Sequence, residues 1–402
     1  MKKLKIIFCT LLATIFIVPF NIFAATVSSE CDISDINIPI DATVTDAAIG
    51  TKLDIKAKSA ILMEKNSGKI LYEMNADQKM PPASITKIMS LLLVMEAIDQ
   101  NKIKLEDVIT ASEHACSMGG SQIWLEAGEP MTVDDLLKAA VIASANDATV
   151  VLGEHIAGSE EGFVAMMNEK AAALGMTNTN FVNATGLDAE GHVSTAHDIA
   201  IMSAELLKHD LIKNYSTIWM DTLRDGKSEL VNTNKLVRFY EGTTGLKTGT
   251  TSGAGYCLAA SAERGGLELV AVIMAGDTSA DRFNGAKKLL DYGFANYEYT
   301  TVAPKLKTQE LSVKNGVEQT APIKASSSFG ALLKKSESAA ITQKLNLPEN
   351  IVAPVKAGDK IGTVDFYLGD SQIGSVDVVS TADIEKMSFL TAFLWVFNGL
   401  FH

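Results

Sequence analysis

The sequence of 402 residues predicts an α/β (α+β) protein, in which a sandwich of strands and helices carries an inserted helical lobe and is followed by a small all-β domain. Within residues 46–298, strand patterns stand at both ends and helical patterns fill the middle. After residue 298, short alternation of apolar and polar residues with turn signals replaces the helical patterns. An aromatic stripe near the C-terminus predicts a final amphipathic helix.

Residues 1–25 are predicted to be a secretory signal peptide. Lys2, Lys3 and Lys5 precede an apolar stretch at residues 6–18, and small residues follow at the expected cleavage point. A transmembrane helix is the alternative, but the apolar stretch is short for a span. We therefore expect the mature chain on the extracellular or periplasmic face of the cytoplasmic membrane.

Composition excludes a disulfide framework and a nucleic-acid partner. Cys31, Cys116 and Cys257 remain after cleavage, and an odd number of scattered cysteines predicts isolated thiols. The formal net charge of −13 would repel a phosphate backbone.

Two β-hairpins and two capped helices frame the predicted domain. Each hairpin has a glycine-containing turn, and each helix start has a threonine followed three residues later by an aspartate. The hairpins are 59–64 with 69–74 and 255–262 with 267–275, and the helix starts are Thr132 with Asp135 and Thr195 with Asp198.

Residues 84–100 are predicted to form a buried helix that begins after Pro81 and Pro82. Ser84 and Lys87 share one face of this helix, because residues three apart lie side by side. A serine hydroxyl needs a base within hydrogen-bond reach, which makes Ser84 a candidate nucleophile and Lys87 its base. Lys87 must then be partly neutral, and burial near a second cation lowers a lysine pKa.

Ser144 and Asn146 belong to a short loop between helical patterns at residues 133–142 and 147–156. We expect Ser144 to relay a proton between Lys87 and the leaving amine, and Asn146 to bind a substrate carbonyl and orient Lys87. A helix N-cap role for either residue is compatible with this interpretation.

The tripeptide Lys247-Thr248-Gly249 precedes the apolar run at residues 256–260, which predicts the start of a strand near a sheet edge. An extended peptide could lie antiparallel to that edge. Gly249 has no side chain to obstruct it, and Lys247 with Thr248 would bind a terminal carboxylate. A surface turn is the alternative.

The motifs SITK at 84–87, SAN at 144–146 and KTG at 247–249 each occur once, in this order. Together they resemble those of the penicillin-recognising serine enzymes. The runs SQIWLEAGE at 121–129, ASANDA at 143–148, GLD at 186–188 and HVSTAHD at 192–198 resemble those of the low-molecular-mass D-alanyl-D-alanine carboxypeptidases.

This resemblance implies a β-lactamase/transpeptidase-like catalytic domain that trims peptidoglycan stem peptides ending in D-Ala-D-Ala and is inhibited by β-lactams. Ser84 would attack the carbonyl between the two D-alanines, and the backbone N–H groups of Ser84 and Thr250 would stabilise the oxyanion. Water would then release the acyl group. Arg282 resembles a family arginine near the substrate carboxylate, although a surface arginine paired with Asp277 or Asp281 is the alternative.

Neither a cofactor nor a metal is implied. The six histidines form no H-E-x-x-H pattern, and the cysteines have no ligand spacing. The one pair that we weigh as metal ligands, His192 with His197, is more readily explained by packing or capping.

The remaining segments are predicted to be a β domain at 299–383 and a membrane-associating segment at 384–402. In the family, such a β domain resembles a stalk that sets the catalytic lobe at a distance from the membrane. The last segment places Phe389, Phe393, Phe397 and Phe401 four residues apart with Trp395, and it is too short to span a bilayer. A helix docked on the protein is the alternative.

Other functions remain open from sequence alone. A D,D-endopeptidase would use the same residues. A β-lactamase is disfavoured because Glu190 is followed four residues later by Ser194, so that no E-x-x-x-N motif forms. A non-catalytic wall-binding protein would not need the intact motifs.

Overall fold

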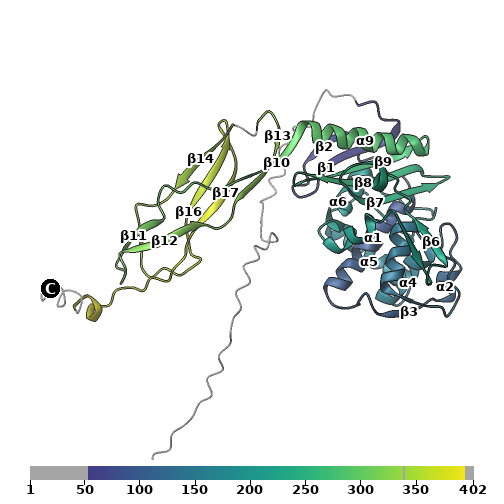
Figure 1. The fold of residues 1–402 in the computed structure, drawn as a ribbon, viewed down its shortest axis with the longest axis horizontal. Helices are drawn as coiled ribbons and strands as arrows, with labels where there is room; N and C mark the ends of the chain where they lie inside the picture. The colour runs from purple at the N-terminus through teal and green to yellow at the C-terminus, as the bar shows by residue number, and fades with distance from the viewer. Residues whose placement is uncertain (1–52, 338–339, 394–402) are drawn as a thin grey trace, which may run out of the picture. The chain divides into compact units, whose positions relative to one another are not determined.

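The computed structural model describes residues 53–393 except 338 and 339 (Figure 1). The predicted signal peptide at 1–25 and the end of the aromatic stripe at 394–402 lie outside the described residues. Among the helices that the structure describes, none has both the length and the apolar character needed to cross a bilayer.

The first domain is built on a five-stranded antiparallel sheet with strand order β2-β1-β9-β8-β7. Both predicted hairpins are confirmed, as β1 with β2 and as β8 with β9. Strand β7 pairs only with β8 within this sheet and is therefore an edge strand. The strands are β1 (Ala57–Glu64), β2 (Ile70–Met74), β7 (Thr243–Thr251), β8 (Gly255–Arg264) and β9 (Leu267–Gly276).

Helices cover both faces of this sheet. Along β9, Val270, Val272 and Met274 join the core of the helical lobe, whereas the residues between them face the second core under α9 (Ser279–Asn296). Helix α6 (Ala196–Leu206) packs on the other face (Figure 1). The alternation follows from the two-residue period of a strand.

The helical lobe lies between β2 and β7 in the sequence, as predicted. Thr132 and Thr195 cap their helices, because each hydroxyl accepts a hydrogen bond from the backbone N–H of the aspartate three residues on. The lobe contains α1 (Lys87–Asp99), β3 (Val108–Thr110), α2 (Glu113–Cys116), β4 (Pro130–Thr132), α3 (Val133–Lys138), α4 (Asn146–Ala157), α5 (Glu160–Ala173), α6, α7 (Lys213–Ser216), β5 (Met220–Leu223), β6 (Ser228–Val231) and α8 (Leu236–Phe239).

The second domain is all-β, as predicted. Its core includes Phe329 and Phe366, whose rings stack with centroids 4.2 Å apart. One sheet has the order β14-β16-β17-β12-β11-β15, and β10 pairs with β13. The strands are β10 (Tyr297–Val302), β11 (Glu310–Lys314), β12 (Thr320–Ala325), β13 (Phe329–Lys334), β14 (Ile341–Asn346), β15 (Asn350–Val352), β16 (Lys360–Leu368) and β17 (Ser371–Ser380).

The chain stays in this domain beyond β17. Ile384 is 2% exposed and forms an isolated bridge with Val355, and Lys386 bridges Gly316. Residues 389–393 are helical. The segment that leaves the β domain therefore begins after Met387, four residues later than the sequence pattern suggests.

Candidate active site

Ser84 lies in a 3-10 turn, η2 (Ala83–Thr86), that runs directly into α1. The sequence pattern predicts an α-helix from Ser84 onward, but regular α-helix begins at Lys87. Ala83 has a positive φ of 50°, so the chain turns sharply between Pro82 and the helix. This turn places the Ser84 hydroxyl at the start of α1, where it is only partly buried.

Lys87 lies at the centre of the site. Its side chain is fully buried, and Nζ contacts Ser84 Oγ at 3.1 Å, Asn146 Oδ1 at 2.5 Å and the Thr185 carbonyl at 2.8 Å. Burial holds the pKa of Lys87 well below its usual range, and the charge of Lys247 lowers it further against the opposing effect of Asp147. The neutral amine is therefore favoured.

The neutral amine fits these three contacts. It has two N–H donors and one lone pair. The Asn146 and Thr185 oxygens can only accept hydrogen bonds, so they take the two donors. The lone pair is then left for the hydroxyl proton of Ser84, which is the geometry that a general base requires.

Ser144 and Asn146 complete this side of the site. Ser144 follows a π-helical turn, has a positive φ of 63° and is 3% exposed, and its hydroxyl has no partner within the described part of the chain. Asn146 begins α4, and its Nδ2 donates to the Gly119 carbonyl at 2.6 Å. That bond fixes the amide so that Oδ1 faces Lys87.

Strand β7 forms the opposite wall. Lys247 is 1% exposed, and its Nζ has no partner among the residues that the structure describes. Burial, together with the charge of Arg282, lowers the pKa of Lys247 to about 7. The KTG tripeptide lies within β7 and pairs with β8, with Lys247 opposite Ala259, instead of starting the strand that contains residues 256–260. Thr248 Oγ1 donates to Thr233 Oγ1 at 2.7 Å.

Arg282 is buried, so its interpretation as a surface arginine is wrong. It is 8% exposed, and Nη1 donates to the Gly249 carbonyl at 3.0 Å and to Thr250 Oγ1 at 2.9 Å. Asp281 accepts a hydrogen bond from the Thr278 hydroxyl instead of the Arg282 guanidinium. Arg282 therefore supports the strand next to the nucleophile.

Unpartnered polar atoms concentrate in this site. Buried polar groups are normally hydrogen-bonded, so each exception calls for an explanation. Five buried side-chain atoms of the described residues have no partner, and three of them are Ser144 Oγ, Lys247 Nζ and Arg282 Nε. Sequence reasoning assigns Ser144 to the proton relay, and places Lys247 and Arg282 near the substrate carboxylate.

Gly249 has a role that sequence reasoning did not include. A Cβ at this position would lie 3.0 Å from both the Pro82 carbonyl oxygen and the Ser84 nitrogen. Gly249 thus allows β7 to approach the turn that carries the nucleophile. Gly186 likewise allows its own loop to approach this turn, because an added Cβ would overlap the Ala83 carbonyl.

Three further supports were missed. Besides the Thr185 carbonyl, the fully buried Asp147 accepts from the backbone N–H groups of Ile123 and Leu125 at 3.1 Å. The ring of His192 lies 2.8 Å from Thr86 Oγ1, in the turn between Ser84 and Lys87. Asp147 and His192 had a signal, since they lie within the ASANDA and HVSTAHD runs, whereas the Thr185 carbonyl had none.

His192 and His197 do not converge. His192 Nδ1 accepts from the Val182 N–H at 3.0 Å, so both of its ring nitrogens have protein partners, whereas His197 contacts Asp77. Burial lowers the pKa of His192 to about 4. Within the described residues, no group of three or more His, Cys, Asp or Glu side chains is placed to hold a metal ion.

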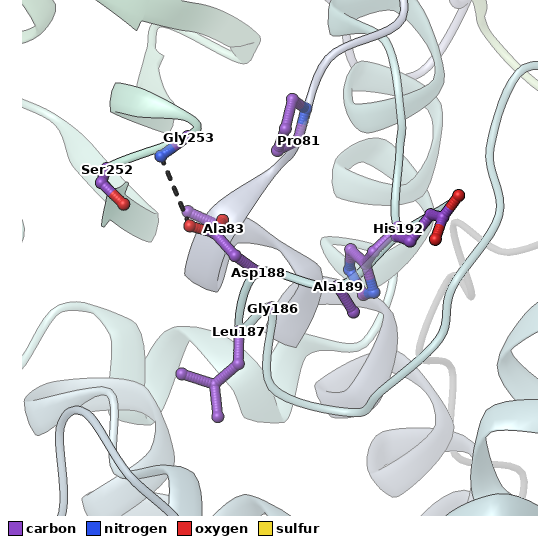
Figure 2. A pocket seen from close by; sticks show the side chains of 10 residues that line it. Pro81, Ala83, Gly186, Leu187, Asp188, Ala189, His192, Ser252 and Gly253 are labelled. Carbon is purple, nitrogen blue, oxygen red and sulfur yellow. Dashed lines mark hydrogen bonds between the residues drawn. The ribbon is translucent and has the colours of Figure 1, made fainter.

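A cavity of about 490 Å³ lies beside the nucleophile turn. Figure 2 shows its walls: the loop that contains Gly186, Leu187 and Asp188 passes between the turn at Ser252–Gly253 and His192. Ala83, the residue immediately before Ser84, also lines it. The cavity therefore adjoins the reactive centre.

Comparisons with known proteins find matches over both domains. The family model described as D-alanyl-D-alanine carboxypeptidase matches residues 44–278, and the model for the C-terminal domain of penicillin-binding protein 5 matches residues 297–386. D-alanyl-D-alanine carboxypeptidase DacF of Bacillus subtilis is 43% identical over 346 residues, which cover 85% of this chain and 89% of the relative. DacC of Escherichia coli is 35% identical, with 83% and 86% covered.

Solved structures are similar as well. Penicillin-binding protein 5 of Haemophilus influenzae superposes with a TM-score of 0.70 at 33% identity, covering 84% of this chain and 99% of that one. Penicillin-binding protein D2 of Listeria monocytogenes, in its ampicillin-bound form, has a TM-score of 0.56 at 34% identity, with 61% and 100% covered.

Proposed function

The chain belongs to the D-alanyl-D-alanine carboxypeptidase family, and from this membership we propose how its buried side chains divide the reaction. It is a serine-type enzyme that releases the terminal D-alanine of peptidoglycan stem peptides through an acyl-enzyme, and it binds β-lactams. The observation that carries the proposed roles is the set of three contacts made by Lys87 Nζ.

In the first step, Ser84 Oγ attacks the carbonyl carbon between the two D-alanines while Lys87 accepts the hydroxyl proton. Two oxygen acceptors hold the amine, so its lone pair faces Ser84. The oxyanion is stabilised by the backbone N–H groups of Ser84 and Thr250. Support comes from the close approach of β7 to Ser84 at Gly249.

The departing D-alanine needs a proton on its nitrogen and a site for its carboxylate. Ser144 Oγ, which is buried and has no protein partner, passes the proton from Lys87 to the amine. Lys247 Nζ and the Thr248 hydroxyl bind the carboxylate. The arriving carboxylate restores the charge of Lys247, because an opposite charge raises a lysine pKa.

In the second step, water attacks the acyl-enzyme, Lys87 again accepts a proton, and the shortened peptide leaves. Asn146 holds the acyl-side carbonyl and keeps Lys87 in place. Arg282 acts on β7, through the Gly249 carbonyl and the Thr250 hydroxyl, and so positions the strand that binds the substrate.

We also propose that the enzyme is exported and peripherally attached to the membrane. The composition of residues 1–25 supports export. Attachment is supported by the helical residues 389–393, where the side chains of Phe389 and Leu390 are 88% and 66% exposed. The substrate is found on the outer side of that membrane, where an exported enzyme would meet it.

The test measures D-alanine release from a muropeptide ending in D-Ala-D-Ala. The protein should lack residues 1–25 and 388–402, because Ile384 belongs to the β-domain core. We expect release by the parent protein and none by Ser84→Ala. Release that survives in Ser84→Ala would contradict the assigned nucleophile, whereas cleavage of crosslinked dimers alone would favour the D,D-endopeptidase alternative.

A further inference from the structure

We propose that the cavity beside Ser84 is the subsite for the amine-bearing side chain of the stem-peptide residue that precedes D-Ala-D-Ala. The inference rests on the proposed function, because it names a recognition element for that same substrate.

The expected direction of the bound substrate brings this residue toward the cavity. If the substrate strand lies antiparallel to β7 with its carboxylate at Lys247, its N-terminal part runs toward Thr251. The chain continues from Thr251 into Ser252 and Gly253, which line the cavity. One residue of an extended strand advances about 3.3 Å. The residue before the two alanines lies two positions, about 6.6 Å, from the carboxylate end, beside Gly249 and Thr250, and its long side chain extends toward Ser252 and Gly253.

The charged side chains that line the cavity favour a cation. The carboxylates of Asp188 and Glu190 line the cavity, and among the described residues no lysine or arginine does so. His192, on the opposite wall in Figure 2, adds no positive charge near neutral pH, because burial lowers its pKa to about 4. A cavity with two carboxylates and no cation is complementary to an ammonium group.

Two hydrogen bonds hold the Asp188 carboxylate in place. Asp188 accepts hydrogen bonds from Thr251 Oγ1 at 2.6 Å and from the Gly253 N–H at 3.3 Å, and Figure 2 draws the second of these. Each bond goes to a different carboxylate oxygen, and each oxygen can accept a further donor. The two bonds hold Asp188 against the end of β7, so the carboxylate is positioned before a ligand arrives.

The experiment compares two tripeptide substrates, Nα-acetyl-L-lysyl-D-alanyl-D-alanine with a free side-chain amine and the same peptide with that amine acetylated. We expect kcat/KM to be about three- to five-fold higher for the free amine at low ionic strength, as suits an exposed ion pair. One molar salt should remove the preference, since it reduces the Debye length to about 3 Å.

Glu190→Gln and Asp188→Asn test the assignment, and Glu106→Gln, an exposed carboxylate before β3 that does not line the cavity, is the matched control. The preference should shrink toward one in the first two variants and persist in the third. Labelling by a fluorescent penicillin reports that each variant is folded and can be acylated.

The outcomes separate the two claims. Release of D-alanine at equal rates from both peptides overturns the subsite and leaves the carboxypeptidase in place. A preference that survives in both Glu190→Gln and Asp188→Asn also overturns the subsite. Failure to release D-alanine from either peptide, with penicillin labelling intact, overturns the proposed function and with it the subsite.

Discussion

At the residue scale, the site depends on side chains that are buried in the form in which they react. Lys87 is fully buried and still has polar partners, which separates it from an ordinary core residue. The SITK motif predicted the pairing of Ser84 with Lys87. It could not predict the Thr185 carbonyl, because that acceptor lies 98 residues away and has no side-chain signature.

His192 makes the nucleophile turn sensitive to acid. Its folded-state pKa is about 4, below its ordinary value of 6.5, so its contribution to stability is complete above pH 6.5 and is lost as the pH falls toward 4. The physical reason is burial, which disfavours the charged ring and outweighs the opposing effect of Asp188; in the neutral ring, Nδ1 accepts the Val182 N–H.

We therefore expect wild-type stability to fall by about 3 kcal/mol more than that of His192→Gln between pH 6.5 and 4. Urea unfolding at several pH values measures this difference. His197→Gln, which changes an exposed histidine, is the control. Parallel stability curves for wild type and His192→Gln would contradict the assignment.

At the scale of elements, the site is assembled by three segments that press together: η2, β7 and the loop at Gly186. The sequence predicted the hairpins, the caps and the helix that carries Lys87, because period and turn chemistry are local signals. It gave no sign that Gly249 and Gly186 are contact points. Their neighbours come from segments that are distant in the sequence.

Gly186→Ala should therefore impair both stability and activity. The new Cβ would overlap the Ala83 carbonyl, and the φ of 84° adds strain for any L side chain. We expect a loss of more than about 2 kcal/mol of unfolding free energy, together with slower acylation by a fluorescent penicillin.

The control for this prediction is Gly175→Ala. Gly175 has a similar φ of 75° but has nothing within 4 Å of an added Cβ. It should show only the backbone strain of about 1–2 kcal/mol and an unchanged acylation rate. Equal acylation rates in the two variants would show that the contact with Ala83 does not position Ser84.

At the scale of the whole molecule, the β domain contains none of the three motifs, so it contributes no residue to the proposed chemistry. Its described C-terminal end is a short helix with exposed aromatic side chains. Sequence reasoning identified this segment by its four-residue aromatic spacing. Sequence reasoning placed the start of this segment at residue 384. No local pattern in the sequence shows that Ile384 is buried against Val355 and Gly316.

Removal of residues 388–402 should release the enzyme from membranes without changing its chemistry. We expect the full chain to sediment with phosphatidylglycerol vesicles and the truncated chain to remain in the supernatant, with equal D-alanine release in solution. Phe389→Asn in the full-length chain is the matched variant and should weaken sedimentation, because it removes exposed apolar area. Equal sedimentation of the full and truncated chains would contradict the attachment proposal.

The open edge of β7 also carries a hazard for the folded protein. A strand that must accept a peptide along its edge is equally able to pair with the edge of a second copy, which is a common route to aggregation. The usual safeguards, proline or outward-pointing charge, would interfere with Lys247, Thr248 and Gly249. Protection has to come from covering the strand: η2 meets it at Gly249, and the Ser216 hydroxyl and the Asn234 amide donate to the Thr244 and Gly245 carbonyls, so that the exposed length suits a short peptide better than another sheet.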